Sequence, residues 1–150
     1  MYAMLSAIFN YVCWIGSQFN ETKDRRELYV EGMTRITLHE RALLYRLLHG
    51  SDEVKGLLDI EGVKVAVDMD DLTQRDLIVP IVFDKMTCEE ASRAYEAKGV
   101  VVHERTDASL YSARQVNSIG LHGIVRVSPL HCHTYADIDE FLRITAEIAK

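Results

Sequence analysis

The hydrophobic periodicity of the chain changes at Gly50. Before Gly50, apolar residues recur at spacings of three, four and seven, which predicts an amphipathic helix from Met33 to about Gly50. After it, valines alternate along 62–68, which predicts a half-buried strand. The polar side of the helix is expected to be a solvated face. Its residues are His39, Glu40, Arg41 and Arg46.

The first sixteen residues, MYAMLSAIFNYVCWIG, carry no charge. The run is shorter than the roughly 20 residues that a spanning helix needs, and it lacks the basic region and cleavage site of a signal peptide. We therefore expect a buried helix rather than a membrane segment. A helix that is apolar all round needs partner surface on several sides. The polar stretch Ser17–Gly32 is expected to be a loop or a frayed turn.

The remainder of the chain predicts four strands and two capped helices. The strands are expected at 62–68, at 76–83, at 100–105 and from Ile124 onward. Pro80 indicates an edge or a bulge in the second of them. Capping boxes predict the helix starts, and a glycine that favours the left-handed region ends the first helix. These signals are Thr87 with Glu90, Thr134 with Asp137, and Gly99.

This order of elements predicts an α+β fold. The expected architecture is a small mixed or antiparallel sheet of about four strands, with helices on one face and two helices before it. With 150 residues, of which 48% are hydrophobic, the chain can bury one sizeable core. We expect a helical segment at 1–50 and an α/β unit at 51–150, with a loop at 106–123 of which a part is helical.

Charge and cysteine content narrow the function classes. A formal net charge of -6, from 17 basic and 23 acidic residues, leaves no basic stripe for nucleic acid. The three cysteines form no C-x-x-C pair, which is typical of reduced thiols in a cytoplasmic protein. His131 and His133 flank Cys132, but an extended segment would place the cysteine on the opposite side, so no metal site is expected.

The ending GIVRVSPLHCHTYADIDEFLRITAEIA, residues 123–149, resembles the C-terminal signature of the class V aminotransferase and cysteine desulfurase-like family. An arginine-bearing strand leads there through a turn into a terminal helix that contains Asp-Ile-Asp. The upstream helices, the capped helix and the Gly-Val-Val-Val strand fit as well. The resemblance implies the C-terminal small domain of a fold type I enzyme that depends on pyridoxal phosphate. The segment 1–50 would then pack on a missing large domain or on a homodimer partner.

The family holds its cofactor as a Schiff base on a lysine of the large domain. The six lysines of this chain have no matching context, so we expect no covalent pyridoxal phosphate and no catalytic residue in it. The small domain contributes cations that grip the α-carboxylate of an amino acid substrate. Arg126 matches the strand arginine, and alternation with its valine neighbours points it to a polar face, where it is either this clamp or a surface ion pair.

A second cation is less clearly placed by the resemblance. His103 stands where the family usually has an arginine, and Arg105 follows on the same strand face, so either side chain could serve. The segment 106–123 contains no cysteine, whereas desulfurases carry a nucleophilic one in that loop. This difference favours an aminotransferase, an epimerase-like or an uncharacterised desulfurase-like member over a desulfurase, with transferase or lyase chemistry on an amino acid. The alternative is a non-catalytic α+β module that binds a small ligand or another chain through its N-terminal helix.

Overall fold

The computed structural model describes residues 2–150, with side chains from residue 3 onward. Met1, the first residue of the predicted N-terminal segment, lies outside the described residues. The chain divides into two compact units, one that ends at Glu40 and one that runs from Arg41 to Lys150. Among the described residues, no helix is long and apolar enough to cross a membrane.

The N-terminal unit pairs α1, Tyr2–Ser17, with the first part of α2, Arg25–His49. The two helices meet at glycines, because a Cβ on Gly16 would lie 1.9 Å from the Leu28 carbonyl oxygen and one on Gly32 would lie 2.1 Å from that of Val12. Only one side of α1 is covered within this unit. An apolar stripe on the helix stays exposed. It consists of Met4, Leu5, Ile8, Tyr11 and Trp14.

The predicted loop Ser17–Gly32 is wrong beyond Asp24, because α2 begins at Arg25. The Asp24 carboxylate accepts hydrogen bonds from the backbone N–H groups of Arg26 and Glu27, at 2.7 and 3.1 Å. It therefore satisfies two donors that a helix start leaves free. The glycine inside this stretch, Gly32, does not end the helix but permits the close approach of α1.

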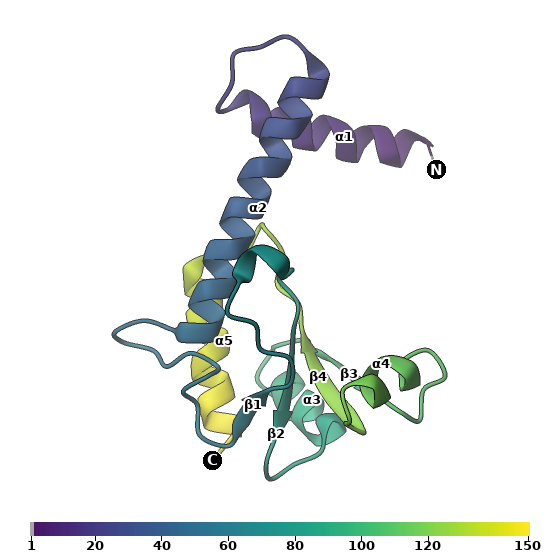
Figure 1. Ribbon diagram of the computed structural model, residues 1–150. Helices are drawn as coiled ribbons and strands as arrows, with labels where there is room; N and C mark the ends of the chain where they lie inside the picture. The colour runs from purple at the N-terminus through teal and green to yellow at the C-terminus, as the bar shows by residue number, and fades with distance from the viewer. Residues whose placement is uncertain (1) are drawn as a thin grey trace. The chain divides into compact units, whose positions relative to one another are not determined.

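The C-terminal unit contains one four-stranded antiparallel sheet, which confirms the predicted α+β fold (Figure 1). Its strands are β1, Val63–Val65; β2, Val79–Phe83; β3, His103–Thr106; and β4, Gly123–Val127. They lie in the order β1-β2-β4-β3, so β1 and β3 form the two edges. Pro80 lies in the interior strand β2, opposite Arg126 of β4.

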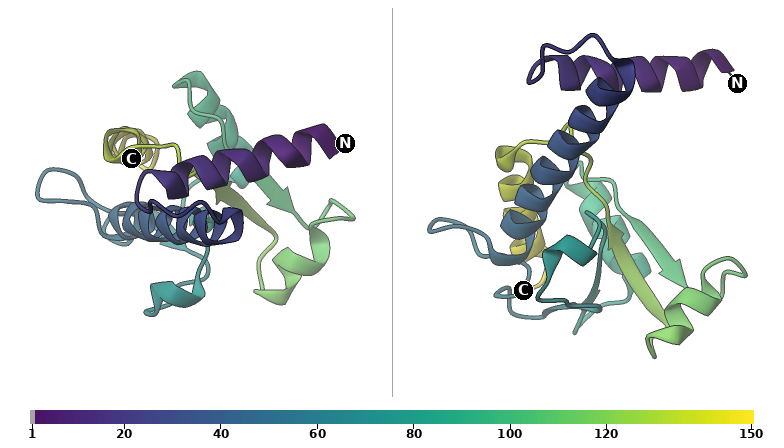
Figure 2. Two further views of the ribbon diagram at one scale, coloured as in Figure 1. Left: turned by 90° about the horizontal axis from the view of Figure 1, so that it is seen from above. Right: turned by 45° about the horizontal axis from the view of Figure 1, so that its top comes forward.

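Helices cover one face of this sheet. The core joins the inward residues of β2 and β4 to the end of α2, to α3, Cys88–Ala97, and to α5, Tyr135–Ile148. In Figure 2, α5 lies beside the C-terminal end of α2. Two short helices, the 3-10 helix η1, Leu72–Gln74, and α4, Ala113–Ser118, lie in the connections. The core strand residues are Val79, Ile81, Val125 and Val127.

Both predicted capping boxes are confirmed. Thr87 with Glu90 begins α3, and Thr134 with Asp137 begins α5. Gly99 has the predicted positive φ, 79°. The third strand begins later than expected, at His103, because the N–H of Val100 donates to the Tyr95 carbonyl and keeps the chain at the helix end.

The predicted solvated face of α2 is wrong at Arg46. This side chain is only 28% exposed and pairs with Asp139 of α5, which is 15% exposed. The Nε and Nη2 atoms of Arg46 each lie 2.7 Å from one carboxylate oxygen. Two parallel hydrogen bonds of this kind hold a guanidinium in a fixed orientation. Arg46 therefore joins two helices of the C-terminal unit.

Candidate functional site

Arg126 projects from the sheet face that the core helices do not cover. Its neighbours Val125 and Val127 are buried in the core, and side chains alternate along a strand, so Arg126 points to the opposite face. The residue is half-buried. Its Nε atom is buried and has no hydrogen-bond partner among the described residues.

His103 and Arg105 share this face with Arg126. His103 of the edge strand β3 lies directly opposite Arg126, and Arg105 lies opposite Ile124. Residues paired in antiparallel strands place their side chains on the same face. The structure therefore brings together the three side chains that the sequence singled out. His103 is exposed, and Arg105 is half-buried with its Nη1 atom 3.0 Å from the Glu104 carbonyl oxygen.

No carboxylate neutralises Arg126 within the described chain. It takes part in none of the ion pairs formed by residues 3–150. Glu104 is adjacent in β3, but it pairs with Val125 and so belongs to the other face of the sheet. A half-buried guanidinium without an ion-pair partner in the described chain is a favourable site for an external carboxylate.

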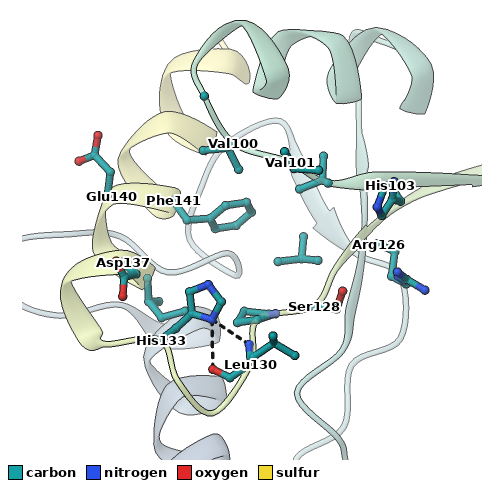
Figure 3. A pocket seen from close by; sticks show the side chains of 15 residues that line it. Val100, Val101, His103, Arg126, Ser128, Leu130, His133, Asp137, Glu140 and Phe141 are labelled. Carbon is teal, nitrogen blue, oxygen red and sulfur yellow. Dashed lines mark hydrogen bonds between the residues drawn. The ribbon is translucent and has the colours of Figure 1, made fainter. Parts of the chain in front are cut away.

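The turn after β4 is held by His133. The backbone N–H of His133 donates to the Leu130 carbonyl at 2.9 Å. Its Nδ1 atom lies 2.9 Å from the Leu130 nitrogen and 3.1 Å from the Leu130 oxygen (Figure 3). Side chain and backbone therefore fix the same turn, which positions the start of α5.

A groove of about 490 Å³ lies next to this turn. The ring of Phe141 points into it, while Arg126 and His103 lie at one end and Asp137 and Glu140 at the other (Figure 3). The pKa of Asp137 is lowered, because its carboxylate accepts hydrogen bonds from the backbone and hydroxyl of Thr134. The sequence did not predict this groove.

Neither Cys88 nor Cys132 lines the groove next to Arg126. Cys88 begins α3, and burial raises the pKa of its thiol to about 11, with a further contribution from Glu89, so it is not a ready nucleophile at neutral pH. Cys132 is exposed in the turn before α5. Among residues 3–150, no group of three or more His, Cys, Asp or Glu side chains is placed to hold a metal ion.

The chain is similar to known proteins in structure but not detectably in sequence. No protein-family model matches the chain, and no curated protein matches it. A solved structure that does match is the apo structure of the cysteine desulfurase from Thermococcus onnurineus NA1, with a TM-score of 0.67 and 18% sequence identity. The match covers 83% of this chain but 28% of that one. At this identity the likeness shows a shared fold, and this chain spans about a quarter of the length of that enzyme.

Proposed function

We propose that this chain forms the C-terminal small domain of a pyridoxal-phosphate-dependent enzyme of the class V family and binds the carboxylate of an amino acid substrate. The unpaired guanidinium of Arg126, on the open face of β4, carries the proposal. Two further observations support it. The motif around Arg126 resembles that family, and the fold is similar to part of a cysteine desulfurase.

The lysines of this chain do not fit a covalently held cofactor. All six are exposed, and none lines the groove beside Arg126. Lys64 and Lys98 form surface ion pairs with Asp84 and Glu147. The Schiff-base lysine of the proposed enzyme must therefore come from a large domain. The contribution of this chain is to bind and orient the substrate.

Arg126 would orient the substrate through its two-pronged geometry. A guanidinium and a carboxylate form two parallel hydrogen bonds, so they fix the direction of the bound molecule, which a lysine ammonium does less well. His103 lies opposite and adds a second donor, and Arg105 adds positive charge two residues along β3. Fixing the carboxylate fixes the Cα to which it is attached, which is the positioning that transferases and lyases of amino acids require.

The experiment is a carboxylate titration of the full chain followed by nuclear magnetic resonance. L-alanine is added to ¹⁵N-labelled protein, and we expect saturable shifts of the backbone amides of His103 and Arg126. Arg126→Lys should weaken the binding about tenfold or more, because the bidentate contact is lost. Arg114→Lys, an exposed arginine of α4, is the matched control and should change nothing. Absence of saturable shifts, or equal binding by Arg126→Lys, would refute the carboxylate clamp.

A second candidate function rests on a different observation, the exposed apolar stripe of α1. A non-catalytic module that binds another chain through this helix would need such a surface. The two candidates differ in the titration above, because the binding module predicts no response of β3 and β4 to L-alanine.

A further inference from the structure

The pairing of β3 with β4 ends one residue before β4 itself ends. Its last pair is His103 with Arg126, whereas β4 stays paired with β2 for one residue more, Val79 with Val127. The residues just before β3 do not follow β4, because the N–H of Val100 donates to Tyr95 at the end of α3. The two chain segments therefore separate beyond Arg126.

Beyond this last pair, continued strand alternation would direct the backbone groups of Val101 and Ser128 into the separation. Pro80, which pairs with Arg126, has no N–H, and its carbonyl accepts a hydrogen bond from the Ala66 N–H on the β1 side. The backbone N–H and carbonyl of Arg126 therefore point toward β3. Successive residues of a strand point their backbone N–H and carbonyl groups to opposite sides. Those of Val127 therefore point toward β2, and those of Ser128 would point to the β3 side. Neither Val101 nor Ser128 makes a backbone–backbone hydrogen bond within residues 2–150.

The groove of about 490 Å³ lies in this separation and is lined by both segments, 99–103 and 126–130. Its size falls within the range of about 300–1,000 Å³ that is usual for ligand sites. Phe141 points into it from α5 (Figure 3). At its rim Val101 is 78% exposed and Leu130 is 57% exposed. Apolar walls beside unpaired backbone groups match an extended peptide, whose amides and side chains alternate.

We propose that the groove binds an extended peptide segment of another chain, inserted as a strand between Val101 and Ser128. The charged residues at the two ends of the groove restrict the sequence of this peptide further. The end at Arg126 and His103 carries a cation without an ion-pair partner in the described chain, and the end at Glu140 carries acids. The segment therefore places an apolar side chain over Phe141 and a carboxylate near Arg126. The proposal uses Arg126 as a cation and does not depend on an amino acid substrate.

The test uses a pool of fluorescein-labelled heptapeptides that alternate valine, isoleucine or threonine with small polar residues and carry one glutamate. Binding to the full chain is followed by fluorescence anisotropy, and the complex by hydrogen exchange. We expect saturable binding and slowed exchange of the amides of Val101 and Ser128. The same peptides with N-methylated backbone should bind at least tenfold more weakly, because they cannot pair as strands.

Two variants locate the site without touching Arg126. Val101→Pro removes one open N–H, and Leu130→Asp places a charge at the apolar rim; each should weaken binding at least tenfold. Leu110→Asp is the matched control, an 88% exposed leucine outside the groove, and should bind as the unaltered chain does. If circular dichroism shows that Val101→Pro does not fold, the binding of Leu130→Asp alone decides the test.

Three results would overturn the proposal. The first is no saturable binding by any peptide of the pool. The second is equal binding of the N-methylated peptides, which would make the groove a site for apolar groups only. The third is binding of octanoate as tight as that of the peptides, which would make it a site for an amphipathic acid. The L-alanine titration of Arg126 is independent of all three.

Discussion

The guanidinium of Arg46 in α2 and the carboxylate of Asp139 in α5 form a bidentate pair between residues 93 positions apart in the sequence. Both side chains are largely shielded from water. We expect Asp139→Asn to lower the free energy of unfolding by about 1–3 kcal/mol, because it weakens hydrogen bonds to a charged group and leaves Arg46 without its counter-charge. Urea denaturation measures this change. Glu140→Gln breaks an exposed pair with Arg143 and should cost less than about 0.5 kcal/mol.

The same pair predicts how stability depends on pH. Hydrogen bonding from Arg46 lowers the pKa of Asp139 below its ordinary value of about 3.9. The stabilisation is therefore complete above that value and is lost as the pH falls through the lower pKa of the folded state. Urea midpoints of the unaltered chain and of Asp139→Asn should differ at pH 7 and converge as the pH falls through the lowered pKa of Asp139. A constant difference across this range would contradict the assignment.

A buried pair of hydroxyls joins α3 to α5. The Thr145 hydroxyl donates to the Phe141 carbonyl at 2.7 Å, so the Tyr95 hydroxyl, 2.7 Å away, is the donor between the two. Tyr95→Phe removes this donor and should cost about 1 kcal/mol. Thr145→Val should cost more, about 1–3 kcal/mol, because it leaves the Tyr95 hydroxyl buried without an acceptor. Thr145→Ser is the control that keeps the oxygen, and urea denaturation ranks the three.

Burial also raises the pKa of Tyr95. The neutral phenol is therefore favoured in the folded state, and its contribution to stability is present below the ordinary tyrosine pKa of about 10 and lost as the pH rises above it. Absorbance at 295 nm should show one phenol that is still protonated above pH 10. In Tyr95→Phe this late step should be missing.

Gly123 at the start of β4 lies against the Cys88 thiol, which a side chain at this position would have to displace. A Cβ added there would lie 2.5 Å from the Cys88 sulfur, and the next nearest atom, the Cβ of Cys88, would be at 3.7 Å. Gly123→Ala should therefore destabilise the chain by about 1–3 kcal/mol through overpacking. Adding Cys88→Ala removes the sulfur and should recover part of the loss. Thermal denaturation of both single variants and the double variant measures the coupling, and purely additive effects would contradict it.

The parts of the fold that the sequence predicted well depend on neighbours in the chain. A capping box joins positions three apart, such as Thr134 and Asp137, so its signal is complete in four residues. The polar orientation of Arg126 likewise follows from alternation with Val125 and Val127. The start of α2 was missed although Asp24 is a good capping residue, because the charged stretch after it shows no apolar period.

The features that the sequence did not reveal depend on contacts between distant segments. Gly32 reads as a loop residue until α1 is seen to cross it at Val12. The missing ion-pair partner of Arg126 depends on which side chains stand opposite it, Pro80 on one side and His103 on the other. The groove opens because α3 ends in a way that holds Val100 away from β4. No local pattern contains these three relationships.

The uncovered stripe of α1 leads to a prediction about assembly. Met4, Leu5, Ile8, Tyr11 and Trp14 are all exposed on a helix that carries no charge, and a surface of this kind favours association with another apolar surface. We expect the isolated chain to associate with a second copy through α1, which light scattering and sedimentation would show as a mass that rises with protein concentration.

Two substitutions test whether the stripe is responsible. Leu5→Glu and Ile8→Glu each place a charge within it and should shift the equilibrium toward the monomer by tenfold or more, because an unpaired carboxylate is costly to bury. Leu110→Glu makes the same change at an exposed leucine of the C-terminal unit and should leave the association unchanged. A monomer that stays monodisperse at high concentration, with α1 helical by nuclear magnetic resonance, would show that a second copy does not cover the stripe.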